Sequence, residues 1–321
     1  MRILVTGATG FVGRALSERL QAVPGVRVVA GLRDAGSLPA ATNVDRLILG
    51  DLATDAIDPA ALQGIAVVVH CAARVHVMQE RSDDPLADFR RVNLQGTLKL
   101  AQAAAQAGVK RFIFLSTIKV NGEQTVPGSN FTADDCPAPT DPYAVSKFEA
   151  EQALLQLAAG GAMEVVIIRP PLVYGPGVKA NFLSMMRWLS KGLPLPLGAI
   201  HNRRSLVGLP NLVDLLVCCL DHPAATNQVF LVSDGESLST TELLRKLASA
   251  LQRPARLLPV PQGWLQAGAV LLGRRSVGQR LCGSLSVDIG KNRQLLGWSP
   301  PFSSDQVLRQ TAADFLGQEA R

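Results

Sequence analysis

The sequence has little of what marks several classes of protein. Aromatic residues make up only 5% of its 321 residues, and the basic residues are not grouped with them, which argues against a nucleic-acid partner. The five cysteines have no metal-ligand spacing and the four histidines are scattered, so we expect no metal site. Unpaired cysteines and the absence of a secretory signal predict a cytoplasmic protein.

No apolar run reaches the roughly 20 residues that a membrane-spanning helix needs. The longest, at residues 264–272, is short and is interrupted by Gln266 and Gly268. We interpret it as an apolar helix under a small domain. The alternative is an interfacial helix at a membrane surface, because three arginines follow within residues 274–280.

What the chain does have is apolar content and positive charge. Apolar residues make up 47% of the sequence, enough for the core of one large or two modest domains. The net charge of +6 is modest and fits an anionic small-molecule substrate.

A glycine loop lies near the N-terminus. The apolar run at residues 1–5 predicts a buried strand, Gly7, Gly10 and Gly13 follow it, and a helical pattern then begins. Gly7 permits a tight turn, Gly10 lets the backbone approach a pyrophosphate, and Gly13 lets the helix pack closely on the strand. Because a helix N-terminus attracts anions, this order predicts dinucleotide binding.

Tyr143 and Lys147 are spaced as neighbours on one face of a helix. A nearby ammonium group can lower the pKa of a phenol from about 10 toward neutrality. Tyr143 could then act as a general acid or base at a carbinol oxygen.

Strand-like and helix-like segments alternate through the first half of the chain. This alternation predicts an α/β protein with a Rossmann-type, doubly wound parallel sheet. Long helices are expected at 86–107 and 141–159, and further strands at 26–32, 45–49, 65–71, 111–116 and 165–169. We expect an NAD(P)-binding domain at 1–170, with 207–232 returning to it, and a smaller C-terminal α/β substrate lobe at 171–206 and 233–321.

The end of the second predicted strand bears on the choice of cofactor. An NAD enzyme usually has an acidic residue there to hold the ribose 2′-hydroxyl, but this chain has Leu32, followed by Arg33 and Asp34. A guanidinium suits a 2′-phosphate, so the sequence favours NADP. NAD stays the alternative, with Arg33 stacked on the adenine.

Over almost its whole length the chain resembles the extended short-chain dehydrogenases/reductases that act as nucleotide-sugar epimerases, dehydratases and reductases. The resemblance rests on residues 6–13, 50–52, 70–73, 93–97, 116–122, 143–147, 169–177 and 296–300. Segments 72–78 and 116–123 are similar to bacterial surface-polysaccharide enzymes that act at C4 of UDP-N-acetylhexosamines.

The resemblance assigns roles to individual residues. Thr117 would complete a catalytic set with Tyr143 and Lys147, and Lys147 would also bind the nicotinamide ribose. Cofactor contacts are implied for Gly7, Gly10, Phe11, Val12, Gly13, Arg33, Asp51, Leu52, Ala72 and Ala73. Substrate contacts are implied for Asn181, Arg204 and Arg280, with Arg204 at the diphosphate of a UDP-sugar. A homodimer formed by the two long helices is also implied.

Ile118 and Lys119 stand where sugar 4,6-dehydratases carry an Asp-Glu pair, so dehydration is disfavoured. We therefore expect hydride exchange at C4 of a UDP-sugar. The leading interpretation is 4-keto reduction of a UDP-N-acetylhexosamine-derived sugar. The alternatives are a 4-epimerase with tightly bound NAD and, more remotely, a non-catalytic nucleotide-binding protein.

Overall fold

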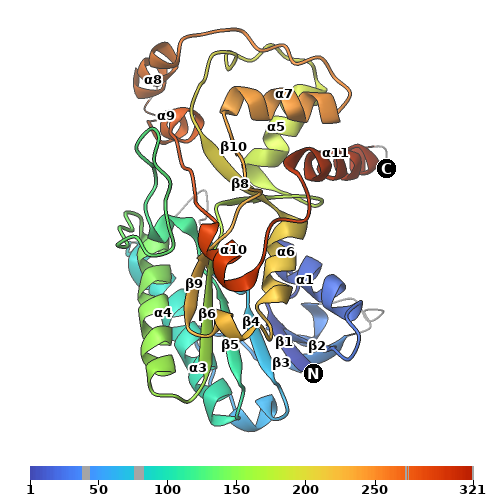
Figure 1. The fold of residues 1–321 in the computed structure, drawn as a ribbon, viewed down its shortest axis with the longest axis vertical. Helices are drawn as coiled ribbons and strands as arrows, with labels where there is room; N and C mark the ends of the chain where they lie inside the picture. The colour runs from blue at the N-terminus through green and yellow to red at the C-terminus, as the bar shows by residue number, and fades with distance from the viewer. Residues whose placement is uncertain (38–43, 76–82, 272, 274, 320–321) are drawn as a thin grey trace.

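The computed structural model describes the chain except residues 38–43, 76–82, 272, 274 and 320–321, and except the side chains of 269, 275–277 and 280. Figure 1 shows a larger part built on a central sheet and a smaller lobe beyond the carboxyl ends of its strands.

The larger part is organised by a seven-stranded parallel sheet, which confirms the predicted α/β class. The inner strands, such as those at residues 67–70 and 164–169, are largely apolar because helices cover both faces of the sheet. In spatial order they are β3 (Asp45–Ile48), β2 (Arg27–Leu32), β1 (Arg2–Thr6), β4 (Val67–His70), β5 (Arg111–Leu115), β6 (Glu164–Arg169) and β9 (Gln228–Leu231).

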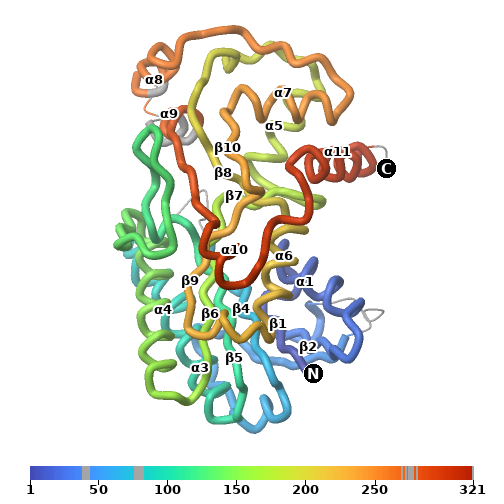
Figure 2. The backbone as a smooth tube through the Cα atoms, viewed as in Figure 1, coloured from blue at the N-terminus to red at the C-terminus, as the bar shows by residue number. Residues whose placement is uncertain are grey.

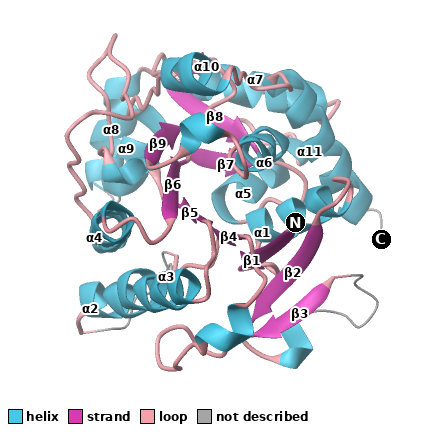
Figure 3. Cartoon of the chain, turned by 60° about the horizontal axis from the view of Figure 1, so that its bottom comes forward, coloured by secondary structure: helices cyan, strands magenta, loops and turns pink. Residues whose placement is uncertain are grey.

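Two pairs of helices cover the sheet (Figure 3). On one face α1 (Phe11–Gln21) lies beside α6 (Leu209–Cys218), and both contribute to one apolar core. On the other face α3 (Thr97–Gln106) and α4 (Pro142–Ala159) enclose a second core. Residues 212–220 therefore return to the sheet mainly as a helix that covers it.

The helix expected at 86–107 is divided into three pieces. Between α2 (Pro85–Phe89) and α3, residues Arg90–Gly96 form a π-helical turn. Its buried Asn93 accepts a hydrogen bond from the Arg74 amide at 2.8 Å and donates to the Ser146 hydroxyl at 3.0 Å. The periodicity of apolar residues does not reveal this π-helical turn, because the hydrogen-bond partners of Asn93 lie far from it in the sequence.

The smaller lobe contains a three-stranded sheet in the order β10 (Ser237–Leu238), β8 (Arg204–Gly208) and β7 (Leu172–Tyr174). Around it lie α5 (Ala180–Ser190), α7 (Thr240–Ala250), α8 (Gln262–Leu271), α9 (Arg275–Cys282), α10 (Gly290–Leu296) and α11 (Ser304–Glu319). Residues 193–198 form no strand; Leu195 makes an isolated bridge with Leu257.

The apolar segment 264–272 corresponds to α8, although Leu272 and the following Arg274 lie outside the described residues. The interpretation of a helix packed under the lobe is wrong, because Trp264 is 77% exposed and Leu271 is 87% exposed. Leu265 makes partial contact with the core. Across the described part of the chain, no helix combines the length and apolar character that a membrane span requires.

The homodimer stays a prediction that the fold allows, because α3 and α4 lie together on one face of the sheet. We expect both helices to pair with their copies in a second subunit and so to stiffen α4. Light scattering should then give twice the chain mass of 34.1 kDa. A single-chain mass at micromolar concentration would contradict this assembly.

Candidate functional site

The glycine loop between β1 and α1 leaves a cradle of bare backbone. Gly7 has a φ of 65°, which favours glycine. A Cβ at Gly13 would lie 2.2 Å from the Gly7 carbonyl oxygen, so only glycine lets the helix approach the loop this closely. Among the described residues, no side chain caps the start of α1 at Gly10, which leaves its first amide groups available to an anion.

This loop opens onto a cavity of about 750 Å³. Of the expected cofactor residues, the cavity is lined by Gly7, Gly10, Arg33, Asp51, Leu52, Ala72 and Ala73. Phe11, Val12, Gly13 and Lys147 are not part of its lining. Together, the cradle and the cavity fit a dinucleotide whose pyrophosphate lies at the start of α1.

Arg33 lies at one end of this cavity, together with Asp34 and Asp51. Its Nε atom is 3.9 Å from a carboxylate oxygen of Asp51, and the Arg33 side chain is 73% exposed. Such an exposed ion pair is worth at most about 1 kcal/mol. Arg33 is therefore held only loosely by the protein.

Asp141 starts the helix that carries Tyr143 and Lys147. Its carboxylate accepts a hydrogen bond from the Ala144 amide at 2.7 Å, and Pro142 occupies the first turn. Thr117 follows β5 and caps a short 3-10 turn by accepting from the Lys119 amide at 3.3 Å. The Lys119 ammonium pairs with the Asp141 carboxylate, which links the Thr117 turn to the start of α4.

Lys147 is almost completely buried, and its ammonium nitrogen lies 3.9 Å from the centre of the Phe114 ring. Burial lowers the pKa of Lys147 to about 7, although the Glu151 carboxylate and Cys71 act in the opposite direction. Cys71 is one of the residues that line the cavity at the glycine loop, and the charge of Lys147 partly offsets the rise that burial causes in the pKa of the Cys71 thiol.

The pKa of the Tyr143 phenol is shifted in the direction opposite to our expectation. Burial, helped by the Asp141 carboxylate, raises its pKa to about 12. From the sequence spacing we expected a lowered pKa for Tyr143, because a fully charged Lys147 near the ring would stabilise the phenolate. A lysine with a pKa of about 7 carries only part of that charge at neutral pH. In this structure Tyr143 is therefore a protonated phenol, suited to donating a proton.

Beneath these residues lies a buried polar network. The Arg169 guanidinium of β6 donates to the Glu151 carboxylate of α4 at 2.6 Å, and both side chains are at most 5% exposed. Ser116, the neighbour of Thr117, donates to the same carboxylate. Arg169 also donates to the Asn121 amide oxygen at 2.9 Å. The network therefore ties α4 to the ends of β5 and β6.

His70, at the end of β4, is a site residue that the sequence analysis missed. Its Nδ1 lies 2.7 Å from the Thr6 hydroxyl and its Nε2 lies 3.0 Å from the Thr97 hydroxyl. Burial, with a smaller contribution from Lys147, lowers the pKa of His70 to about 3, so the ring is neutral. His70 ends an otherwise apolar run and belongs to segment 70–73 of the family resemblance, but neither signal gave it a role of its own.

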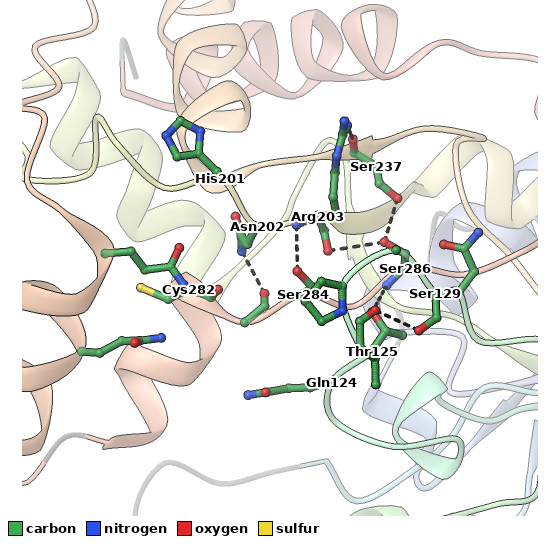
Figure 4. Close-up of a pocket in the computed structure, with 17 residues that line it drawn as sticks. Gln124, Thr125, Ser129, His201, Asn202, Arg203, Ser237, Cys282, Ser284 and Ser286 are labelled. Carbon is green, nitrogen blue, oxygen red and sulfur yellow. Dashed lines mark hydrogen bonds between the residues drawn. The ribbon is translucent and has the colours of Figure 1, made fainter.

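A second cavity, of about 610 Å³, lies between the loop at residues 124–130 and the smaller lobe (Figure 4). Its lining is polar, with several serines and amides around Arg203. The lining includes Gln124, Thr125, Ser129, Asn130, His201, Asn202, Arg203, Ser237, Gln262, Gln266, Ser284 and Ser286. These groups suit a ligand with many hydroxyl and phosphate oxygens.

The three expected substrate residues are dispersed. Arg204 does not line this cavity, and its Nη1 donates to the Gly283 carbonyl at 3.1 Å, whereas its neighbour Arg203 does line it. Asn181 is exposed on α5 and lines neither of the two described cavities. Arg280 lies in α9, and its side chain is outside the described residues.

Comparison with known proteins agrees with this geometry. The model of the NAD dependent epimerase/dehydratase family matches residues 3–233. The chain is 49% identical over 98% of its length to a UDP-glucose 4-epimerase of Vibrio cholerae, and covers 95% of it. It is 28% identical over 98% of its length to a GDP-6-deoxy-D-mannose reductase of Pseudomonas aeruginosa, and covers 97% of it.

A solved structure shares the fold. This is the UDP-glucuronic acid 4-epimerase of Bacillus cereus in complex with NAD, with a TM-score of 0.79 and 22% identity. The match covers 99% of each chain.

The lowered pKa of Lys147 predicts a pH dependence of stability. The pKa is about 7 in the folded chain against 10.5 for an ordinary lysine. Between these values the unfolded chain binds more protons, so the free energy of unfolding should rise with pH. Lys147→Met should remove this rise, which amounts to about 3 kcal/mol between roughly pH 7 and 9.5.

Denaturant titrations across this pH range check the effect. Lys110→Met is the matched control, since Lys110 is exposed and should leave the slope unchanged. If the parent and Lys147→Met have parallel pH profiles, Lys147 is not a buried, depressed lysine.

Proposed function

Because this chain belongs to the NAD dependent epimerase/dehydratase family, we propose that it epimerises a UDP-sugar at C4 and keeps NAD bound throughout the cycle. The observation that carries the proposal is the pair of Tyr143 and buried Lys147 on α4, with Lys147 acting electrostatically on Cys71, a residue that lines a cavity suited to a dinucleotide. The high identity to a UDP-glucose 4-epimerase supports epimerisation over the 4-keto reduction that the sequence alone favoured.

The proposed cofactor site consists of the glycine loop, the start of α1 and the residues around Asp51 and Ala72. When bound, the oxidised dinucleotide would supply the acceptor for the hydride that leaves C4 of the sugar, together with a positive charge. The Gly10 end of α1 would hold the pyrophosphate. Lys147, which does not line the cavity in this structure, would hold the ribose only after a small local opening, and would add positive charge when protonated.

The proton chemistry is proposed for Tyr143 and Thr117. The Thr117 hydroxyl hydrogen-bonds the C4 oxygen of the sugar and orients it toward the phenol. Tyr143, once deprotonated to the phenolate, would accept the C4 hydroxyl proton as the ketone forms and would return it when hydride comes back to the other face. The pKa of Tyr143 is about 12 in this structure. Proton acceptance by Tyr143 therefore depends on the positive charge that the bound cofactor and protonated Lys147 would add.

A second candidate function is 4-keto reduction with NADPH. Arg33 supports it, because a loosely held guanidinium at the cavity end can bind a 2′-phosphate. The 28% identity to a GDP-6-deoxy-D-mannose reductase supports it as well. Asp51 favours NAD instead, because its carboxylate lies beside Arg33 and would repel an added phosphate.

The two functions separate in one experiment. The purified protein is denatured and its released cofactor identified, while the native protein is incubated with UDP-glucose and UDP-N-acetylglucosamine without added cofactor. We expect NAD in the released fraction and formation of the C4 epimer. Empty protein that converts only a UDP-4-keto-6-deoxy sugar, and requires NADPH, would establish the reductase instead.

Tyr143→Phe tests the proposed acid and base. Loss of the hydroxyl should lower turnover by about two orders of magnitude or more and leave cofactor content unchanged. Tyr174→Phe is the matched control, because it removes the hydroxyl of the chain's other tyrosine, which donates to Asp234 in the smaller lobe. Normal turnover in Tyr143→Phe would refute the assignment.

The arginine pair at 203 and 204 is proposed to hold the diphosphate, and the cavity position of Arg203 makes it the stronger candidate. A charged contact to phosphate is worth about 1.5–3 kcal/mol, so its loss should raise the KM for the sugar nucleotide by about one to two orders of magnitude. Arg203→Ala and Arg204→Ala are compared in steady-state assays, with cofactor content as the control. If neither variant changes KM, the substrate diphosphate binds elsewhere.

A further inference from the structure

The positive charge of this protein is concentrated in two stretches without carboxylates. Residues 165–213 and 243–287 contain 13 lysines and arginines but no aspartate or glutamate. The rest of the chain has 19 basic and 26 acidic residues, so it is net negative. The surplus of +6 is therefore carried by these two stretches of the sequence.

Parts of the two stretches, residues 195–199 and 257–261, lie side by side at the end of the smaller lobe farthest from the N-terminus. Figure 2 shows them as yellow-green and orange segments that run side by side at the top of the view. Bridges join Leu195 to Leu257 and Ala199 to Pro261, in parallel. The Leu195 amide donates to the Arg256 carbonyl at 2.9 Å, and α8 begins directly after this pairing.

Large apolar side chains are exposed at the same end. Trp264 and Leu271 of α8 are 77% and 87% exposed. Leu193, Leu258 and Val270 are each 45% or more exposed. We use the name distal surface for these five side chains together with the exposed Arg253 and Arg256.

We propose that the distal surface docks peripherally on an anionic lipid bilayer. A short apolar helix with an exposed tryptophan, set among basic residues, is the arrangement of interfacial membrane contacts. Trp264 can place its ring at the headgroup level, while Arg253 and Arg256 meet lipid phosphates. The segment is too short to span, so docking would be reversible and dependent on salt.

Charge separates this occupant from a second copy of the chain. Two copies docked through the distal surface would bring basic groups against basic groups, without carboxylates from either stretch to pair them. An anionic bilayer supplies both the negative charge and the apolar layer. Docking does not depend on the reaction proposed above, because the distal surface shares no residue with the candidate catalytic set.

Docking would have a consequence for the site. Gln262 and Gln266 of α8 line the second cavity, on the helix that also carries Trp264 and Leu271. A bound bilayer would therefore lie close to that cavity. A sugar carrier or an acceptor enzyme in the membrane would then be within reach of its ligand.

Co-sedimentation with vesicles tests the proposal on the full chain. We expect binding to phosphatidylglycerol mixed with phosphatidylcholine, little binding to phosphatidylcholine alone, and loss of binding at high salt. Trp264→Ser with Leu271→Ser, and separately Arg253→Glu with Arg256→Glu, should each weaken binding about tenfold or more. Matched controls with parental binding are Ile48→Ser, at an exposed position on β3, and Arg19→Glu with Arg309→Glu.

Tryptophan quenching by lipids brominated near the headgroup gives a second measurement. Quenching should occur in the parent and be lost in Trp264→Phe. The proposal is overturned if the parent fails to bind anionic vesicles, or if the control variants lose binding as much as the distal ones. Self-association that Trp264→Ser abolishes would also overturn it, because the occupant would then be a second copy.

Discussion

The buried ion pair between Glu151 and Arg169 is the interaction on which the candidate site depends. It joins α4 to β6 in the interior, where neither charge reaches water. Glu151 lies one helical turn beyond Lys147, and its second partner, Ser116, lies next to Thr117. Removal of one member of such a pair typically costs about 3–5 kcal/mol, because the other stays buried and uncompensated. The Glu151–Arg169 pair therefore helps to fix the positions of Thr117, Tyr143 and Lys147.

The same low-polarity interior sets the charges of the site. Burial keeps His70 neutral between the Thr6 and Thr97 hydroxyls, and it lowers the pKa of Lys147 to about 7. It also keeps Tyr143 protonated. Each of these groups responds strongly to an added charge, because little water is present to screen it. A site of this kind is poised to change protonation when a charged ligand enters.

Local patterns in the sequence were enough to predict the sheet, the glycine loop and the helix that carries Tyr143 and Lys147. What they missed depends on contacts between distant residues. The π-helical turn around Asn93 and the pairing of Glu151 with Arg169 join segments far apart in the chain. The raised pKa of Tyr143 follows from burial, which spacing does not report. At Arg203 and Arg204, neighbours near the start of a strand point in opposite directions, so a shift of one residue changes which one faces a cavity.

The central claim is that hydride leaves C4 of the sugar and returns to the same carbon while the ketone stays bound. The most direct test uses UDP-glucose that carries deuterium at C4 and follows the product by NMR and mass spectrometry. The account predicts UDP-galactose that keeps its deuterium at C4, without added cofactor. A product that has lost its deuterium, or release of the 4-keto sugar as the only product, would contradict it.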